Sequence, residues 1–224
     1  HKLVFPQMRL KEIHAASWEE KASARRSLGW PEQGPVIVFG TNALPNEQHL
    51  AMAEALRDFR PADPVQVFFP LTYGGDASDR RRLGESIQNR LSHLRPLIID
   101  PFLSDQEINK LRLASTGFVI LRARDQMAAS MFESIVARAD VVTGAWLPYG
   151  DIDDGSVQLH KLHAFDQLSG TLLTLLREDP CRSRERLERN RSAIWEEYNP
   201  DKNLGEWITF YERPQSLSSS QKAD

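Results

Sequence analysis

Cysteine is almost absent from this sequence, since Cys181 stands alone among 224 residues. A single cysteine excludes an internal disulfide bond and any cysteine-rich metal site. This composition is typical of a reducing compartment, so we expect a cytoplasmic protein. The sequence also lacks a run of eighteen apolar residues, which excludes a helical membrane span of ordinary length. We expect any contact with the inner face of a membrane to come from a part of the protein outside this sequence.

An excess of one charge sign is also lacking. The formal net charge is -3 and the isoelectric point is about 6.1, which gives no basic surface for a nucleic acid or an anionic membrane. Hydrophobic residues make up 41% and charged residues 26%, as in ordinary globular proteins, so the chain should fold in water. The first residue is His1 rather than Met, and we expect the chain to be a piece of a longer protein. A small-molecule site remains open, and we expect no nucleic-acid partner.

Short apolar runs alternate with longer amphipathic stretches from Pro35 onward, which is typical of a parallel sheet with crossover helices. The apolar runs predict strands over residues 35–40, 65–69, 97–99, 117–121 and 140–143. The stretches between them predict helices over residues 46–59, 78–94, 104 onward and 125–138. Ser104 and Glu107 have the spacing of a capping box at the start of the third of these helices. The sequence therefore predicts an α/β protein with a Rossmann-like parallel sheet and helices on both faces.

Two flanks lie outside this alternation. Residues 17–28 predict a capped helix before the sheet, and residues 165–176, 182–198 and 204–211 predict helices after it. We divide the chain into an N-terminal flank (1–34), a Rossmann-like domain (35–178), C-terminal helices (179–213) and a disordered tail (214–224). Trp195 and Trp207 on the last helices would be exposed in this chain alone, so we expect a homodimer contact through them.

The loops after the first two strands are candidate binding loops, because ligands of open parallel sheets bind beyond the carboxyl ends of the strands. Gly40, Thr41 and Asn42 follow the first strand, and Tyr73 and Gly74 follow the second. Small residues permit close approach of the backbone to a phosphate or hydroxyl, and an aromatic ring suits a sugar or base. Either loop could equally be a plain turn, in which glycine and asparagine are common.

The loop after the fourth strand carries the most informative charges. Asp125 and Glu133 are eight positions apart, which places both on one helix face if Asp125 begins the helix. A carboxylate suits the vicinal hydroxyls of a sugar, and Arg124 together with a helix N-terminus suits a diphosphate. Glu133 stands among apolar neighbours, where a carboxylate is rarely buried without a partner. The alternative is a solvated charge at the helix edge, paired with Arg124 or Arg138.

Other residues give weaker signals. Trp146 and Tyr149, after the last predicted strand, either wall a nucleobase or cover the end of the sheet. His49 is a weak candidate for a general base. His160 and His163 lack a third ligand nearby, so we expect no metal site there. A Gly-x-Ser-x-Gly elbow and a Walker sequence are both missing, which disfavours a hydrolase or a P-loop enzyme.

The four loops together resemble those of the C-terminal domain of GT-B-type glycosyltransferases. Residues 124–133 resemble the Glu-x7-Glu motif of the family-4 enzymes, with Asp125 in place of the first acid and Glu133 as the second. Residues 40–47, 70–74 and 124–126 are also similar to bacterial 4-acetamido-4,6-dideoxygalactose transferases. The resemblance covers about residues 35–150.

The resemblance implies one half of a GT-B fold that binds a nucleotide diphosphate sugar and needs no metal or other cofactor. It implies that Glu133 binds the donor ribose and that Asp125 lies beside the donor sugar. From its place at the expected helix start, we expect Arg124 to contact the diphosphate. The further donor contacts that we expect are Gly40, Thr41, Asn42, Tyr73, Gly74, Gln126, Ser130, Trp146 and Tyr149. The acceptor, which would be a polysaccharide or a lipid-linked molecule, would bind a partner domain that is not in this sequence. Two alternatives are another GT-B activity, such as 2-epimerisation of a nucleotide sugar or pyruvyl transfer to a polysaccharide, and a non-catalytic binding or regulatory module.

Overall fold

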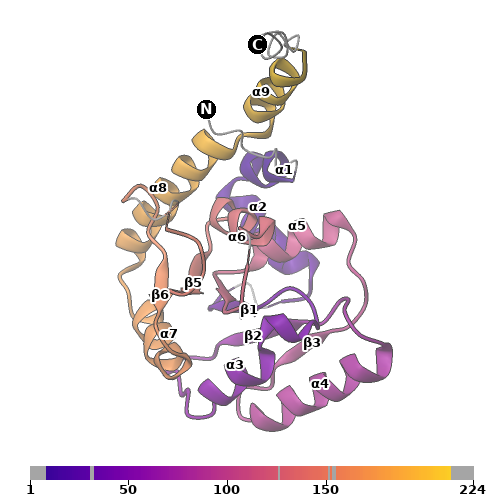
Figure 1. Cartoon of the computed structure of the whole chain (residues 1–224). Helices are drawn as coiled ribbons and strands as arrows, with labels where there is room; N and C mark the ends of the chain where they lie inside the picture. The colour runs from indigo at the N-terminus through magenta and orange to yellow at the C-terminus, as the bar shows by residue number, and fades with distance from the viewer. Residues whose placement is uncertain (1–8, 31–32, 126, 151, 153–154, 213–224) are drawn as a thin grey trace, which may run out of the picture.

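The computed structural model describes residues 9–30, 33–125, 127–150, 152 and 155–212. Its centre is a six-stranded sheet in the order β3-β2-β1-β4-β5-β6, with every neighbouring pair parallel (Figure 1). The strands are β1 (Val36–Phe39), β2 (Gln66–Pro70), β3 (Leu97–Ile99), β4 (Gly117–Ile120), β5 (Asp140–Gly144) and β6 (His160–Leu162). The prediction of a Rossmann-like parallel sheet is confirmed. The sequence did not predict β6, because this short edge strand begins with the polar residues His160 and Lys161.

Helices cover both faces of the sheet because successive side chains of a strand point to opposite sides. Val36 and Val38 of β1 belong to one buried cluster, and Ile37 and Phe39 belong to the other. The helices that contribute to the first cluster are α1 (Leu10–Ala15), α5 (Asp105–Ala114), α6 (Ala129–Val136) and α8 (Pro180–Tyr198). Those of the second are α3 (His49–Ala55), α4 (Ala77–Arg90) and α7 (Leu168–Leu176). The two groups lie on opposite sides of the sheet in Figure 1.

Two predicted helices begin later than the sequence indicated. The helix predicted over residues 125–138 is α6, which begins at Ala129, because Met127 has a left-handed φ of 62° and Ala128 is extended. Asp125 therefore lies in the loop, and the prediction that it shares a helix face with Glu133 is wrong. The helix predicted over residues 46–59 is a short 3₁₀ turn (Pro45–Glu47) and then α3, separated by Gln48 with a φ of 56°. The capping box of Ser104 and Glu107 is present at the start of α5.

The N-terminal flank is joined to the sheet domain by buried cations. Its second helix, α2 (Trp18–Ser27), carries Lys21, whose ammonium donates to the carbonyl oxygens of Leu113, Ser115 and Ala137 at 3.0, 2.5 and 2.9 Å. These carbonyls lie at the C-terminal ends of α5 and α6, where the last carbonyls of a helix have no partner within it. Lys21 thus ties the flank to two helices of the sheet domain.

The last helix, α9 (Pro200–Glu212), extends away from the sheet (Figure 1). Trp207, Phe210 and Tyr211 form an aromatic group on it, with Tyr211 75% exposed. We expected the ring of Trp195, on α8, to be exposed. It instead stacks on His14 of α1, with ring centroids 3.9 Å apart. Within the described part of the chain, no helix combines the length and the apolar character needed to cross a membrane. The predicted disordered tail lies outside the described residues.

Candidate functional site

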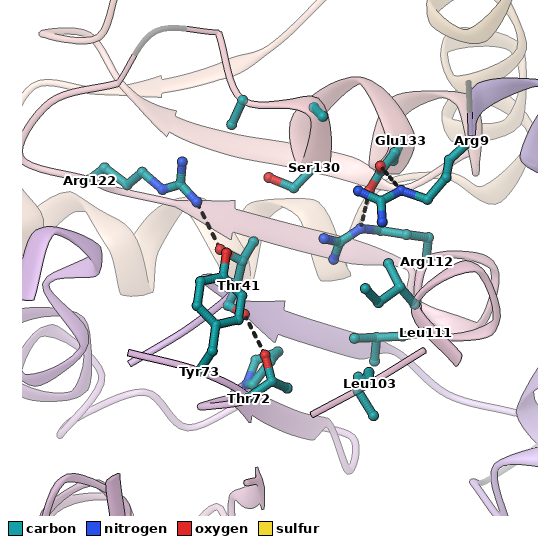
Figure 2. A pocket seen from close by; sticks show the side chains of 14 residues that line it. Arg9, Thr41, Thr72, Tyr73, Leu103, Leu111, Arg112, Arg122, Ser130 and Glu133 are labelled. Carbon is teal, nitrogen blue, oxygen red and sulfur yellow. Dashed lines mark hydrogen bonds and ion pairs between the residues drawn. The ribbon is translucent and has the colours of Figure 1, made fainter. Parts of the chain in front are cut away.

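A cavity of about 280 Å³ lies at the edge of the sheet where the strands end (Figure 2). Its walls come from the segments that follow β1, β2, β3 and β4, and from the start of α6. The residues around it are Arg9, Thr41, Pro70, Thr72, Tyr73, Leu103, Ile108, Leu111, Arg112, Arg122, Ala128, Ala129, Ser130 and Glu133. Four of the predicted site residues, Thr41, Tyr73, Ser130 and Glu133, are therefore brought together here.

One carboxylate between two guanidinium groups forms one end of the cavity. Glu133, on α6, is 2% exposed, and its Oε1 accepts from Arg9 Nε at 2.8 Å while its Oε2 accepts from Arg112 Nε at 3.3 Å. The alternative of a solvated charge paired with Arg124 or Arg138 is thus wrong. We call Arg9, Arg112 and Glu133 the Glu133 cluster.

Arg112 is buried in an unusual way for an arginine. It is 5% exposed and its guanidinium carbon lies 4.9 Å from the centre of the Phe118 ring. Burial lowers the pKa of Arg112, and the charge of Glu133 opposes that effect. A guanidinium carries five N–H donors, and in the described residues Arg112 uses one of them, Nε–H, for Glu133. Figure 2 shows its remaining nitrogens projecting into the cavity.

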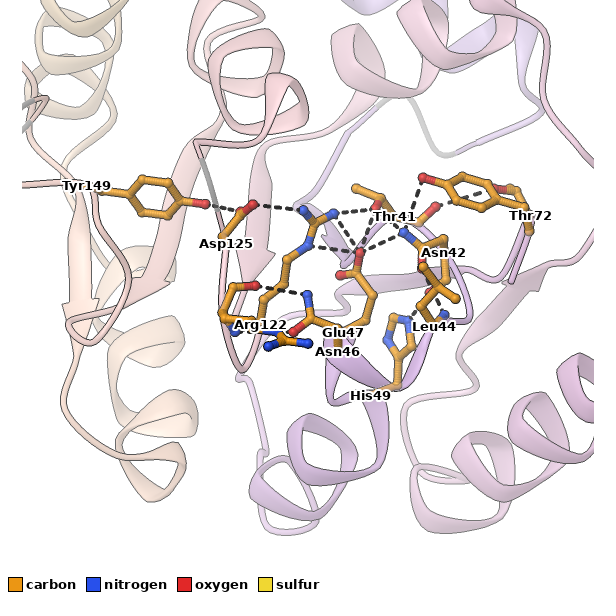
Figure 3. Close-up of polar contacts among 12 residues, drawn as sticks. Thr41, Asn42, Leu44, Asn46, Glu47, His49, Thr72, Arg122, Asp125 and Tyr149 are labelled. Atoms are coloured by element: carbon orange, nitrogen blue, oxygen red, sulfur yellow. Dashed lines mark hydrogen bonds and ion pairs between the residues drawn. The ribbon is translucent and has the colours of Figure 1, made fainter. Parts of the chain in front are cut away.

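Beside the other end of the cavity, which Arg122 and Thr41 line, one guanidinium group lies between two carboxylates. Figure 3 shows these polar contacts. Arg122 donates to Glu47 Oε1 from Nε at 3.0 Å and from Nη2 at 2.7 Å, and to Asp125 Oδ1 from Nη1 at 3.3 Å. A fourth bond joins Arg122 Nη2 to the hydroxyl of Thr41 at 2.8 Å. We call Glu47, Arg122 and Asp125 the Arg122 cluster. The guanidinium of Arg122 thus uses four of its five N–H donors for other protein groups.

The buried side chain of Tyr149 is hydrogen-bonded to the Arg122 cluster. Its side chain is 0% exposed, and its hydroxyl donates to Asp125. Burial, together with the bond to Asp125 and the charge of that carboxylate, raises the pKa of Tyr149. The expectation that Tyr149 walls a nucleobase is wrong for this structure, because the ring has no face open to a ligand.

Trp146 also lies outside the cavity wall. Its Nε1 donates to the backbone oxygen of Arg122 at 2.7 Å, and its ring packs on Phe165 with centroids 5.7 Å apart. An apolar part of the cavity wall is made by Leu103, Ile108 and Leu111. This apolar wall, rather than the turn at Trp146, is the part of the site suited to the flat ring of a nucleobase.

In the loop after β1, Gly40 is required by the close packing of neighbouring side chains. A Cβ on Gly40, where φ is +69°, would lie 2.5 Å from Cε1 of His49 and 2.8 Å from Oε2 of Glu47. His49 is buried, its Nε2 lies 2.6 Å from the backbone oxygen of Asn42, and burial lowers its pKa. The His49 ring is enclosed by the protein and is not part of the cavity wall, so it is not placed to act as a base there. Asn42 holds the loop through bonds to Glu47 and Tyr73.

The remaining predicted residues are placed as follows. Arg124 is exposed and its backbone pairs with the side chain of Asn46, so it does not face the cavity. Gly74 has a φ of +93° and packs against Leu44. Gln126 lies outside the described residues. Ser130, the second residue of α6, has a buried hydroxyl with no hydrogen-bond partner in the described part of the chain.

Four charged residues of the site were not predicted: Arg9, Glu47, Arg112 and Arg122. Arg112 could have been found, because it follows the inward-facing Ile108 by four positions and so falls on the apolar face of α5. It shows the same anomaly as Glu133, a charge at a buried helical position. Arg9 gives no such signal, since it lies 124 residues before its partner.

Comparison of the sequence with protein-family models and with curated proteins finds no match. Solved structures do match. Sucrose-phosphate synthase from Thermosynechococcus elongatus has a TM-score of 0.72 at 14% identity, and the match covers 85% of this chain and 48% of that one.

Two further structures agree with this match. A glycosyltransferase from Rickettsia africae has a TM-score of 0.72 at 13% identity, covering 96% of this chain and 56% of that one. HepE from Anabaena, in complex with UDP and glucose, has a TM-score of 0.70 at 14% identity, covering 89% and 53%. This chain thus spans about half the length of each structure it resembles, and its fold is that of one half of a GT-B protein.

Proposed function

We propose that this chain is the donor-binding half of a glycosyltransferase that transfers a sugar from a nucleotide diphosphate sugar to a polysaccharide or lipid-linked acceptor. The GT-B-like fold and the resemblance of residues 124–133 to a donor motif support this reading. The observation that carries it is Glu133, a buried carboxylate on the wall of a cavity at the carboxyl ends of the strands. The structure with UDP and glucose bound, HepE, is one of those that share the fold.

The cavity offers a place for each part of such a donor. A carboxylate has about four lone-pair positions, and Glu133 uses one on each oxygen for arginine, which leaves acceptors for the two ribose hydroxyls. The first N–H groups of α6, at Ala129 and Ser130, suit a diphosphate. The base would lie against Leu103 and its apolar neighbours, and the sugar beside Thr41 and Tyr73.

Catalysis in this proposal is largely electrostatic and uses no bound metal. As the glycosidic bond to the acceptor oxygen forms, the bond between the anomeric carbon and the diphosphate breaks, and negative charge grows on the diphosphate. The start of α6 would stabilise that charge. Asp125 would act as a positioning residue through Arg122, since its carboxylate is held by Arg122 and Tyr149. The acceptor and any base that takes its proton would be held by a partner domain.

Calorimetric titration of the chain with UDP, GDP and TDP tests the proposal. We expect selective binding of one of the three. The absence of selective heat for all three would favour the non-catalytic module and refute the donor site. The same chain, given a radiolabelled donor and a polysaccharide acceptor, should bind the donor without transferring the sugar, because the acceptor domain is missing.

A further inference from the structure

The three arginines around the cavity differ in how many of their N–H donors the protein uses. Among the described residues, Arg122 uses four, and Arg9 uses two, for Glu133 and Asp105. Arg112 uses one. Arg9 is also 37% exposed, so water can satisfy its other donors, whereas Arg112 is 6% exposed at its side chain.

Four open donors on a guanidinium that lines a cavity suit an acceptor bound in that cavity. Leaving a buried charged donor unpaired costs free energy, and the cost grows when the charge is not balanced nearby. Glu133 carries one negative charge and faces two guanidinium groups; Arg9 has a second carboxylate partner in Asp105, whereas Arg112 has Glu133 alone among the described residues. Arg112 directs its open donors into a cavity that also contains the unpartnered hydroxyl of Ser130 and the start of α6. These groups together match an oxyanion with several acceptor oxygens.

We infer that Arg112 is the residue whose side chain contacts the diphosphate of the donor, in place of the predicted Arg124. The inference rests on the proposed function and specifies it. The planar fork of Arg112 supplies two or more parallel bonds to phosphate oxygens, and Phe118 beneath it fixes the plane. Arg122 has few donors left for a ligand and serves to hold the loops in place.

The test measures what the phosphates add to binding. The probes are the three nucleosides uridine, guanosine and thymidine and their diphosphates, and the quantity is the ratio of the Kd of a nucleoside to the Kd of its diphosphate. Arg112→Met should lower this ratio by about 10- to 100-fold, the factor expected when hydrogen bonds to a charged group are lost. Arg112→Lys, which keeps the charge without the fork, should lower it by less. Arg124→Met should leave it unchanged within twofold, as should Arg81→Met on the exposed side of α4.

The ratio separates a phosphate contact from a structural role. If Arg112 only held Glu133 in place, Arg112→Met would weaken nucleoside and diphosphate equally and the ratio would stay constant, which would overturn the inference. If Arg112→Met does not fold, the same ratio is measured for Arg112→Gln and Arg112→Lys, and an unchanged ratio in both would likewise overturn the inference.

A second probe keeps the two proposals distinguishable. Inorganic pyrophosphate should bind the wild-type chain and bind the Arg112 variants at least tenfold more weakly. Failure of every nucleotide to bind while pyrophosphate still depends on Arg112 would refute the proposed donor function and leave the anion site standing. Equal binding of pyrophosphate to wild type and Arg112→Met would refute the role of Arg112.

Discussion

The clusters at the two ends of the cavity contain the same kinds of group, guanidinium and carboxylate, but in opposite numbers. The Glu133 cluster has two guanidinium groups for one carboxylate, whereas the Arg122 cluster has two carboxylates for one guanidinium. The formal charges of these residues are therefore +1 and -1, and Asp105, which also pairs with Arg9, offsets the first from outside the cluster. Both are largely buried, with side-chain exposures of 3% for Glu133 and 1% for Glu47.

The two clusters also differ in how many of the arginine N–H donors the protein itself uses. In the Arg122 cluster nearly every donor of the arginine is used, and the cluster joins the loops after β1 and β4. In the Glu133 cluster the donors exceed the acceptors, so hydrogen-bonding capacity is left facing the cavity. An excess of donors in a buried cluster is thus a better sign of a ligand site than the presence of charge alone.

The largest expected effect comes from breaking the Arg122 cluster. Arg122→Met leaves two buried carboxylates without their cation, and we expect the free energy of unfolding to fall by about 3–5 kcal/mol. Urea denaturation measures it, with Arg81→Met as the control. A loss below about 1 kcal/mol would show that the cluster is not a structural centre.

Removing the carboxylate charge of the Glu133 cluster should affect both binding and folding, because the buried Arg112 loses its carboxylate partner. Glu133→Gln keeps the shape but weakens acceptance of the ribose hydroxyls, so we expect about 1.5–3 kcal/mol of nucleotide binding to be lost. Calorimetry measures the loss, and Glu85→Gln on the exposed side of α4 is the matched control. Unchanged affinity in a folded Glu133→Gln protein would return Glu133 to a purely structural role.

Tyr149→Phe removes a single bond from the Arg122 cluster. We expect the free energy of unfolding to fall by about 1–2 kcal/mol, because the carboxylate of Asp125 loses one donor but keeps Arg122. The pH dependence gives a second readout. The folded state raises the pKa of Tyr149 above 10.0, so above that pH the unfolded chain loses a proton that the folded protein retains.

Stability from this group is therefore complete below pH 10 and declines as the pH rises further. Tyr149→Phe should lack that component of the decline. Parallel curves for the two proteins above pH 10 would show that the phenol is not shielded as the structure indicates.

The smallest effect is expected for the exposed arginine of the Glu133 cluster. Arg9→Met removes two ion pairs, with Glu133 and with Asp105, in which the arginine is 37% exposed, and such exposed pairs contribute about 0–1 kcal/mol each. Denaturation midpoints should shift slightly, and less at high salt. A loss as large as that of Arg122→Met would mean that the two clusters are structurally equivalent.

The sequence predicted the sheet because β1, β2, β4 and β5 are buried strands with continuous apolar runs. It also predicted Glu133 as unusual, since a charge among apolar helical positions is visible in the sequence. The geometry around Asp125 was out of reach, because the left-handed Met127 moves the start of α6 and no glycine marks it. Long-range pairs such as Arg9 with Glu133 depend on how the flank packs, which local patterns do not encode.

The three bonds of Lys21 have a consequence for hydrogen exchange. The last turns of α5 and α6 receive their ammonium donor from α2, so these helix ends cannot open without releasing the flank. Amides of the flank and of both helix ends should then exchange with deuterium as one cooperative unit rather than fraying independently. A truncation that begins at Pro35 would remove this clamp and leave the C-terminal carbonyls of α5 and α6 without their donor.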